Sequence, residues 1–322
     1  MPAAIPAAVI VAGPTASGKS ALALDLARRL GGTVINADSM QVYRDLRILT
    51  ARPDAAESAA VPHLLYGVRA AAEAASLGWW RGAALAAMAE ARAAGRLPIL
   101  CGGTGLYLVS LTLGLAELPP VPPAARAEAR ALLAALGAPG LHARLAAVDA
   151  ETAATLRPGD SQRVARAFEV WLGSGRGLRE WQRTAGHTGP APWRFAGCLL
   201  DPPRPALRQA VESRFATMLE AGALAEVRAL LAQGLDPALP AMRAHGVPEL
   251  AAYLDGRLTL EAAGRQAVLH TGQYVKRQAT WFRHHRLTEL AATHIIHARY
   301  TGAAQFTESL HEKILAFVDR GC

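Results

Sequence analysis

The residues Gly13–Ser20 read GPTASGKS, and they limit the folds open to this chain more than any other feature. They satisfy the pattern G-x-x-x-x-G-K-[ST], in which glycines let successive backbone N–H groups converge on one anion. An apolar run at 8–13 precedes the loop, and apolar residues at helical spacing follow over 20–30. A strand, a phosphate-binding loop and a helix in this order predict an α/β fold with a parallel sheet.

Further strands and helices alternate on both sides of a helical segment. Apolar runs predict strands at 33–39, 97–103 and 193–200, and apolar spacing predicts helices at 78–95 and 206–233. The proline-rich stretch at 117–123 indicates a linker. The Ala- and Arg-rich stretch after it shows no strand pattern. We therefore predict a P-loop NTPase-like parallel sheet core at 1–118, an all-helical insertion at 119–192, and the continued core with C-terminal helices at 193–322.

The charge balance favours an anionic partner without proving one. Lys and Arg number 34 against 26 Asp and Glu, a net charge of +8. Such a surplus attracts polyanions, although a GC-rich genome that favours arginine explains it equally well.

The compartment is predicted from cysteines and from the apolar segments. Cys101, Cys198 and Cys322 have no metal or redox spacing, which favours a reduced, cytoplasmic setting. No basic segment precedes the first apolar run, which argues against a signal peptide. The uncharged stretch at 97–116 is long enough for a membrane span, but Pro98 and several glycines interrupt it, so we predict no membrane segment.

The phosphate loop predicts both an anion site and a magnesium ligand. Lys19 supplies a positive charge for a phosphate, and the Ser20 hydroxyl can bind Mg²⁺. The predicted diphosphate-binding residues are Gly13, Pro14, Thr15, Ala16, Ser17, Gly18, Lys19 and Ser20. Asp38 ends the next strand. It can hold Mg²⁺ through water, accept a proton as a general base, or serve only as a turn or cap residue.

A second glycine turn, CGGTGLY at 101–107, follows the strand predicted at 97–103. Gly102 and Gly103 permit close approach of the backbone, and Thr104 offers a hydroxyl. The turn is either a second ligand contact or a simple connection from strand to helix.

Several motifs in one order carry a family resemblance. They are GPTASGKS, NADSMQVY at 36–43, TARP at 50–53, GGTGLY at 102–107, GDSQRVARAFEV at 159–170, VESRFATMLEAG at 211–222 and QYVKRQATWFR at 273–283. Together they resemble the bacterial tRNA dimethylallyltransferases over nearly the whole chain.

The resemblance implies a reaction. The enzyme would transfer the dimethylallyl group from dimethylallyl diphosphate to N6 of the adenosine 3′-adjacent to the anticodon, and would release diphosphate. It implies catalytic roles for Asp38, Thr104 and Arg214, with Mg²⁺ as cofactor on Ser20 and, through water, on Asp38. The phosphate loop would then bind an allylic diphosphate in place of ATP.

The resemblance also implies contacts with the tRNA anticodon stem-loop. The residues concerned are Asp38, Ser39, Met40, Gln41, Thr104, Arg126, Gln162, Arg163, Val164, Ala165, Arg166, Lys276, Arg277 and Gln278. Gln41 would contact the adenine or its neighbours. Taken without the resemblance, Arg163 and Arg166 favour a solvated helix face. Trp281 and Phe282 suit either stacked bases or the core, and we expect His63 to be structural. We expect the chain to act as a monomer.

The chain departs from the family pattern at three places. One is the stretch at 159–163, which reads GDSQR where N-D-x-x-R is common. ILTARP at 48–53 has Leu49 and Arg52 where glycine and lysine are usual, and Val247-Pro248 replace an aromatic residue and a cation. These departures put the RNA contacts near 246–248 in doubt. A P-loop kinase of a small metabolite and a non-catalytic RNA-binding protein are the alternatives. The sequence does not decide which tRNAs are modified.

Overall fold

The computed structural model describes residues 5–302, 309, 312–313 and 316–317. The chain divides into two compact units. One comprises residues up to Leu113 together with those from Pro190 onward, and the other is Gly114–Gly189. The sequence placed the helical insertion at 119–192, a few residues further along at each end.

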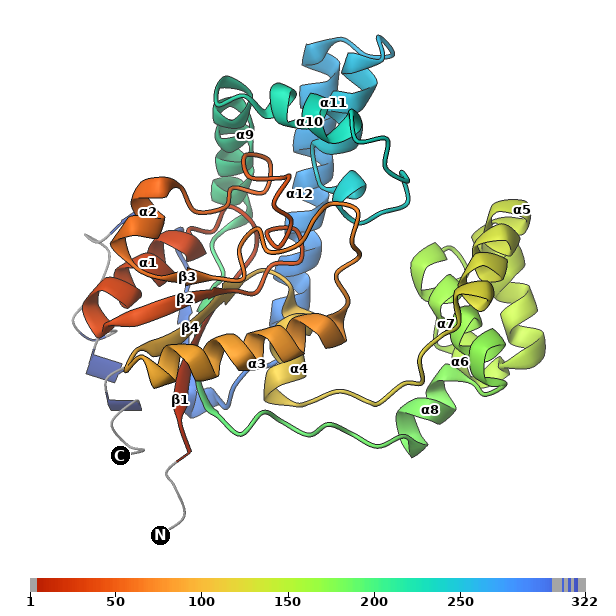
Figure 1. Ribbon diagram of the computed structural model, residues 1–322, viewed down its shortest axis with the longest axis horizontal. Coiled ribbons are helices and arrows are strands. Elements are labelled where there is room, and N and C mark those ends of the chain that lie inside the picture. The colour runs from red at the N-terminus through yellow and green to blue at the C-terminus, as the bar shows by residue number, and fades with distance from the viewer. Residues whose placement is uncertain (1–4, 303–308, 310–311, 314–315, 318–322) are drawn as a thin grey trace. The chain divides into compact units, whose positions relative to one another are not determined.

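The first unit is built on a parallel sheet, which confirms the predicted fold class. Its strands, in the order β3-β2-β4-β1-β5-β6, all run parallel within the described residues (Figure 1). The bounds are β1 Ala7–Ala12, β2 Gly32–Asn36, β3 His63–Leu64, β4 Leu97–Gly102, β5 Arg194–Leu200 and β6 Thr293–Ile296. The prediction missed β3 and β6, one because it has two residues and the other because it is polar at its start.

Helices cover both faces of this sheet. They are α1 Lys19–Leu30, α2 Ala55–Ala60, α3 Leu77–Ala93, α4 Gly105–Thr112, α9 Arg204–Glu220, α10 Ala223–Leu231, α11 Val247–Leu254 and α12 Leu260–His284. The single helix predicted at 206–233 is two helices, because Gly222 adopts a left-handed conformation with φ 101° and ends the first.

Alternation along β1 explains why both faces are covered. Ala8, Ile10 and Ala12 lie in the core cluster that α3, α4 and α9–α12 complete. Val9 and Val11 lie in a second cluster with residues of α1. Since every strand residue from Ala8 to Ala12 is fully buried, β1 is a central strand, as its unbroken apolar run predicts.

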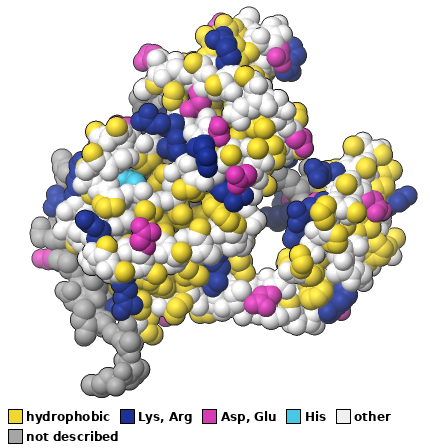
Figure 2. All heavy atoms as spheres, in the orientation of Figure 1, with side chains coloured by type: hydrophobic (Ala, Val, Ile, Leu, Met, Phe, Trp, Pro, Cys, Tyr) yellow, Lys and Arg dark blue, Asp and Glu magenta, His cyan; other side chains and the backbone are white. Residues whose placement is uncertain are grey.

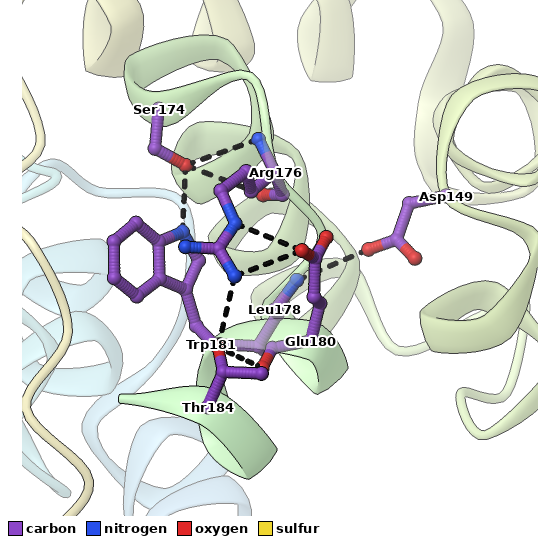
Figure 3. A network of polar contacts seen from close by, with 7 residues as sticks. All are labelled: Asp149, Ser174, Arg176, Leu178, Glu180, Trp181 and Thr184. Carbon is purple, nitrogen blue, oxygen red and sulfur yellow. Dashed lines mark hydrogen bonds and ion pairs between the residues drawn. The ribbon is translucent and has the colours of Figure 1, made fainter. Parts of the chain in front are cut away.

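The second unit is helical. It contains α5 Pro123–Val148, α6 Ala150–Ala154, α7 Ser161–Ser174 and α8 Leu178–Thr184. Asp149 fixes two of these helices, because Oδ1 accepts from the N–H of Thr152 and Oδ2 from the N–H of Leu178, both at 3.1 Å. Figure 3 shows the neighbouring network, in which Arg176 bonds Glu180 and the Trp181 indole donates to the Ser174 hydroxyl.

In the part of the chain that the structure describes, α5 has the length and composition of a membrane-spanning helix. Its helical geometry breaks at Gly137, whose φ is 67° and ψ 174°. Neither half reaches the roughly 20 residues that a bilayer requires. The uncharged stretch at 97–116 contains β4, a turn and α4.

Candidate active site

Three turns of the first unit meet at one edge of the sheet. The phosphate loop follows β1, the turn containing Asp38 follows β2, and the second glycine turn follows β4. β4 pairs with both β1 and β2, so the three strands are neighbours. In open parallel sheets the carboxyl ends of the strands carry the ligand site, and the residues predicted from GPTASGKS, NADSMQVY and GGTGLY lie at those ends.

The phosphate loop combines an unusual backbone with buried polar groups. Ala16 has φ 67°, a left-handed conformation rare for a residue with a Cβ. The Ser17 hydroxyl is fully buried and has no hydrogen-bond partner among the described residues. Lys19 is buried as well, and this burial lowers the pKa of its ammonium while nearby Asp38 raises it. The loop thus presents buried donors that an anionic ligand would satisfy.

The Asp38 turn is shaped by a neighbour that the sequence analysis overlooked. The fully buried Asn36 accepts from the N–H of Asp38 at 2.8 Å and donates to the carbonyls of Asp38 and Leu65. Asp38 Oδ1 accepts from the N–H of Met40 at 2.9 Å. Asp38 Oδ2 makes no hydrogen bond to any described residue, so this oxygen is available for a proton or a ligand.

The second glycine turn packs directly on the Asp38 turn. A Cβ at Gly102 would lie 2.0 Å from the carbonyl oxygen of Ala37, so glycine is required there. The Thr104 hydroxyl accepts from the N–H of Ser39 at 3.0 Å and donates to the Ser39 hydroxyl at 3.3 Å. The structure therefore brings Thr104 and Asp38 together, through Ser39.

Gln278 of α12 joins the phosphate loop to the second glycine turn. Its Oε1 accepts from the N–H of Thr15, and its Nε2 donates to the carbonyl of Gly103, both at 2.9 Å. The side chain is 5% exposed. The prediction that Gln278 faces RNA on the surface is therefore wrong, because both ends of its amide are used inside the protein. Lys276 and Arg277, by contrast, are exposed.

A cationic cavity of about 590 Å³ opens beside the phosphate loop. Its lining includes Lys19, Arg47, Arg52, Arg214 and Arg299. In Figure 2 the Lys and Arg side chains gather on this face between α2 and α9. Burial lowers the pKa of the Arg214 guanidinium and the nearby Asp38 carboxylate raises it. Positive charge held in such a cavity suits a compact, multiply charged anion.

The loop that carries Arg47 and Arg52 is held by Glu226 of α10, another residue that the sequence analysis missed. Its carboxylate accepts from the N–H groups of Arg47, Ile48 and Leu49 at 2.6, 2.7 and 3.0 Å. Gln41, which is 8% exposed, donates to the carbonyls of Thr50 and Ala51 from the other side. Gln41 thus has a structural task in addition to any contact with a base.

His63 also lines this cavity. The sequence analysis expected this residue to be structural. Its Nδ1 lies 2.9 Å from the carbonyl oxygen of Val61. Burial lowers the pKa of the imidazole, which favours the neutral ring.

In the second unit the predicted RNA contacts divide by exposure. Gln162, Arg163 and Arg166 are exposed on α7, and Arg126 is exposed on α5. Val164 and Ala165 are buried in the helical core, so their side chains are not an RNA surface. Arg163 lies 3.5 Å from Asp160, and Arg166 lies 3.3 Å from Glu169. The positive charge of this face is therefore partly offset.

The departures from the family pattern have a local explanation. Val247 is buried at the first turn of α11, and Pro248 follows it at a position whose N–H would have no partner in the helix. Trp281 is half-buried and Phe282 buried, so both belong mainly to the core.

Comparisons with known proteins agree with this geometry. Residues 41–285 match the family model "IPP transferase" and residues 6–65 match "Isopentenyl transferase". The chain is 61% identical over 311 residues to a tRNA dimethylallyltransferase of Gluconobacter oxydans, covering 97% of this chain and 93% of that protein. It is 58% identical to the tRNA dimethylallyltransferase of Acidiphilium cryptum, covering 97% of this chain and 94% of that protein.

Among solved structures, the fold is similar to the tRNA isopentenylpyrophosphate transferase of Bacillus halodurans, with a TM-score of 0.68 and 30% identity. The match covers 98% of this chain and 97% of the other. A eukaryotic dimethylallyltransferase acting on tRNA matches with a TM-score of 0.77 at 24% identity, over 97% of this chain and 80% of that one. The family prediction made from the sequence is confirmed, and the matches favour a transferase over a kinase.

Proposed function

Because this chain belongs to the tRNA dimethylallyltransferase family, we propose that it transfers a dimethylallyl group from dimethylallyl diphosphate to N6 of the adenosine 3′-adjacent to the anticodon. One observation carries this proposal. Asp38 keeps one carboxylate oxygen available, at the same sheet edge as the phosphate loop. Burial lowers the pKa of Lys19 and of Arg214, and the Asp38 carboxylate partly offsets this lowering.

In the proposed reaction Asp38 is the general base. The amine of adenine is a weak nucleophile because its lone pair is delocalised into the ring. As N6 attacks the allylic carbon, the C–O bond to the diphosphate breaks and Asp38 Oδ2 takes the N6 proton. The N–H of Met40 on Oδ1 holds the carboxylate in one orientation during this step.

The leaving diphosphate accumulates negative charge as the C–O bond breaks. Lys19, Arg214 and the N–H groups of the loop are cations and dipoles that stabilise this charge without reorganising. Arg214 Nη2 donates to the carbonyl of Thr50 at 3.4 Å, which fixes the guanidinium next to the cavity. Thr104 supports the Asp38 turn through Ser39 and stands as a phosphate-side contact by family resemblance.

The residues present suit a magnesium ion. Hydroxyl and carboxylate oxygens are the ligands that Mg²⁺ prefers, and Ser20 is exposed at the start of α1. No cluster of three or more His, Cys, Asp or Glu side chains placed to hold a metal occurs among the described residues. Ser20, with Asp38 acting through water, would hold the ion, and the ion would add charge stabilisation to the leaving group.

We further propose that exposed cations bind the anticodon stem-loop. Lys276, Arg277 and Arg126 are exposed and form no ion pair with a described residue, so they are available for phosphates. Arg163 is also exposed, although Asp160 partly offsets its charge. The target base has to leave its stack before its N6 can reach a buried electrophile, and an unpaired loop lowers the cost of this step. A monomer acting in the cytoplasm, without a membrane segment, is part of the proposal.

The test is transfer of labelled dimethylallyl from its diphosphate to two unmodified anticodon stem-loops. One carries adenosine and the other guanosine 3′ to the anticodon. We expect label on the adenosine RNA alone, and none when Mg²⁺ is chelated. Label on both RNAs would contradict N6 as the acceptor. Absence of label, together with ATP consumption in the presence of small metabolites, would replace the transferase by a kinase.

A further inference from the structure

The segment that follows β6 lies against the phosphate loop. Arg299 Nε donates to the carbonyl oxygen of Ala16 at 2.9 Å, and the N–H of Tyr300 donates to the carbonyl oxygen of Ser17 at 3.0 Å. Two adjacent carbonyls of the loop are thus held by two adjacent residues that are 283 positions away in sequence. These residues lie outside every motif used in the sequence analysis.

Tyr300 is itself firmly anchored. It is 3% exposed and belongs to the core cluster on the α1 face of the sheet. Its hydroxyl donates to Asp25 Oδ2 of α1 at 2.8 Å. A Cβ at Gly18 would lie 1.9 Å from the Tyr300 carbonyl oxygen, so the loop and this segment approach closely enough to require glycine. The segment is therefore fixed to the loop and to the helix that follows it.

These contacts supply hydrogen-bond donors to two carbonyls of the phosphate loop. When backbone N–H groups converge on an anion, the carbonyls between them turn outward and need donors of their own. Ala16 adds a further cost, because its left-handed conformation is unfavourable for a residue with a Cβ. Donors supplied to the carbonyls of Ala16 and Ser17 stabilise this arrangement before any anion binds.

Arg299 has a second feature, since it also lines the cationic cavity with Lys19 and Arg214. Its Nε is used by the Ala16 carbonyl, whereas its Nη groups make no hydrogen bond to any described residue. The guanidinium therefore keeps donors and charge for a ligand in the cavity.

We propose that Arg299 and Tyr300 form a clamp on the phosphate loop, and that Arg299 supplies an additional cation for the diphosphate. Tyr300 is a positioning residue that preorganises the loop, and Arg299 combines this task with charge. The inference rests on the proposed function only for the identity of the ligand as dimethylallyl diphosphate. The class of ligand, a compact anion that carries phosphate groups, follows from the cavity and the loop.

Substitutions at 299 separate the two tasks. Arg299→Gln places an amide where Nε was, so it can still donate to the Ala16 carbonyl while the charge is lost. Arg299→Ala loses both, and Arg299→Lys keeps the charge. Tyr300→Phe removes only the hydroxyl bond to Asp25 and keeps the backbone N–H. Arg257→Ala is the control, because it removes the same charge from an exposed ion pair with Asp255 elsewhere.

Each full-length variant is titrated with inorganic diphosphate in the presence of Mg²⁺ by calorimetry, and its thermal midpoint is recorded. Arg299→Gln should bind diphosphate about tenfold more weakly, equivalent to about 1.4 kcal/mol, with an unchanged midpoint. Arg299→Ala should bind at least as weakly as Arg299→Gln and melt earlier. Arg299→Lys should keep most of the affinity, and Arg257→Ala should match the wild type. In transfer assays Arg299→Gln should raise KM for dimethylallyl diphosphate and leave KM for the stem-loop unchanged.

The results that would overturn the proposal are equally definite. Wild-type affinity in both Arg299→Gln and Arg299→Ala would remove Arg299 from the site. A loss in Tyr300→Phe as large as that in Arg299→Gln would assign the effect to general loosening instead of charge. If the wild type transfers label and Arg299→Gln binds diphosphate as tightly as the wild type, the Arg299 charge has no role in binding, and the proposed function stands. Protein that transfers no label, but whose diphosphate affinity still depends on Arg299, would overturn the proposed function and leave the clamp in place.

Discussion

Replacing Gln278 by leucine tests how the two glycine turns are held together. The leucine side chain is close to glutamine in size but has no donor or acceptor. In the variant, the N–H of Thr15 and the carbonyl of Gly103 both lose their partner. Because no other described side chain bonds these groups, the phosphate loop and the second turn would lose their direct polar link.

The expected magnitude follows from the burial of the two groups. An unsatisfied buried backbone group costs about 1–3 kcal/mol. The bond from Thr15 is only partly buried, so water can replace part of it and the lower end applies. The bond to Gly103 is buried, and the upper end applies there. The sum is a destabilisation of about 2–4 kcal/mol, together with weaker diphosphate binding because the loop is no longer held at Thr15.

The measurement is urea unfolding of the full-length protein, with Gln273→Leu as the matched control. Gln273 lies on the exposed side of the same helix, and surface changes of this kind stay within about 0.5 kcal/mol. If Gln278→Leu unfolds like the wild type but binds the stem-loop less tightly, Gln278 contacts RNA and the bridge is irrelevant. That result would restore the interpretation drawn from the sequence and refute the one drawn from the structure.

Three further predictions concern the site. Asp38→Asn keeps an oxygen for the N–H of Met40 but cannot accept a proton, so transfer should fall by about 10²–10⁴-fold while gel-shift binding of the stem-loop persists; near-normal turnover would remove Asp38 as the base. Glu226→Gln places an NH₂ group against the N–H groups of its loop, and should raise KM for dimethylallyl diphosphate because that loop carries two cavity arginines; an unchanged KM would contradict this. Burial lowers the pKa of His63 below its ordinary value of 6.5. The unfolded chain therefore binds the proton more readily, and the folded protein loses stability relative to the unfolded chain as pH falls below 6.5. Urea midpoints of His63→Gln should fall less between pH 7.5 and 5.5 than those of the wild type.

The sequence predicted those parts of the site that local chemistry determines. The phosphate loop needs particular residues in consecutive positions, and therefore GPTASGKS could be interpreted alone. Asp38 and Thr104 were found because each ends an apolar strand, and parallel strands bring their carboxyl ends to one edge. Long apolar runs also predicted β1 and β4 to within one residue.

The residues that hold these turns in place could not be predicted in the same way. Asn36, Glu226, Gln278 and Arg299 act on backbone groups, and a backbone group looks the same in every sequence. Most of their partners lie far away in the chain, as with the 263 positions between Thr15 and Gln278, although Asn36 also bonds Asp38 two residues away. A polar residue on a mostly polar helix gives no local sign that it will be buried. Only the fold shows that the amide of Gln278 reaches two turns.

The departures from the family pattern illustrate how packing couples distant positions. By resemblance, position 49 is usually glycine and position 247 usually aromatic. Here Leu49 is buried, and its side chain occupies the space beside Gly246, where an added Cβ would lie 2.8 Å from Leu49 Cδ2. Leu49 and Val247 belong to the same core cluster. The two departures therefore lie in one core cluster, and the carboxylate of Glu226 is bonded to the loop that leads to the cationic cavity.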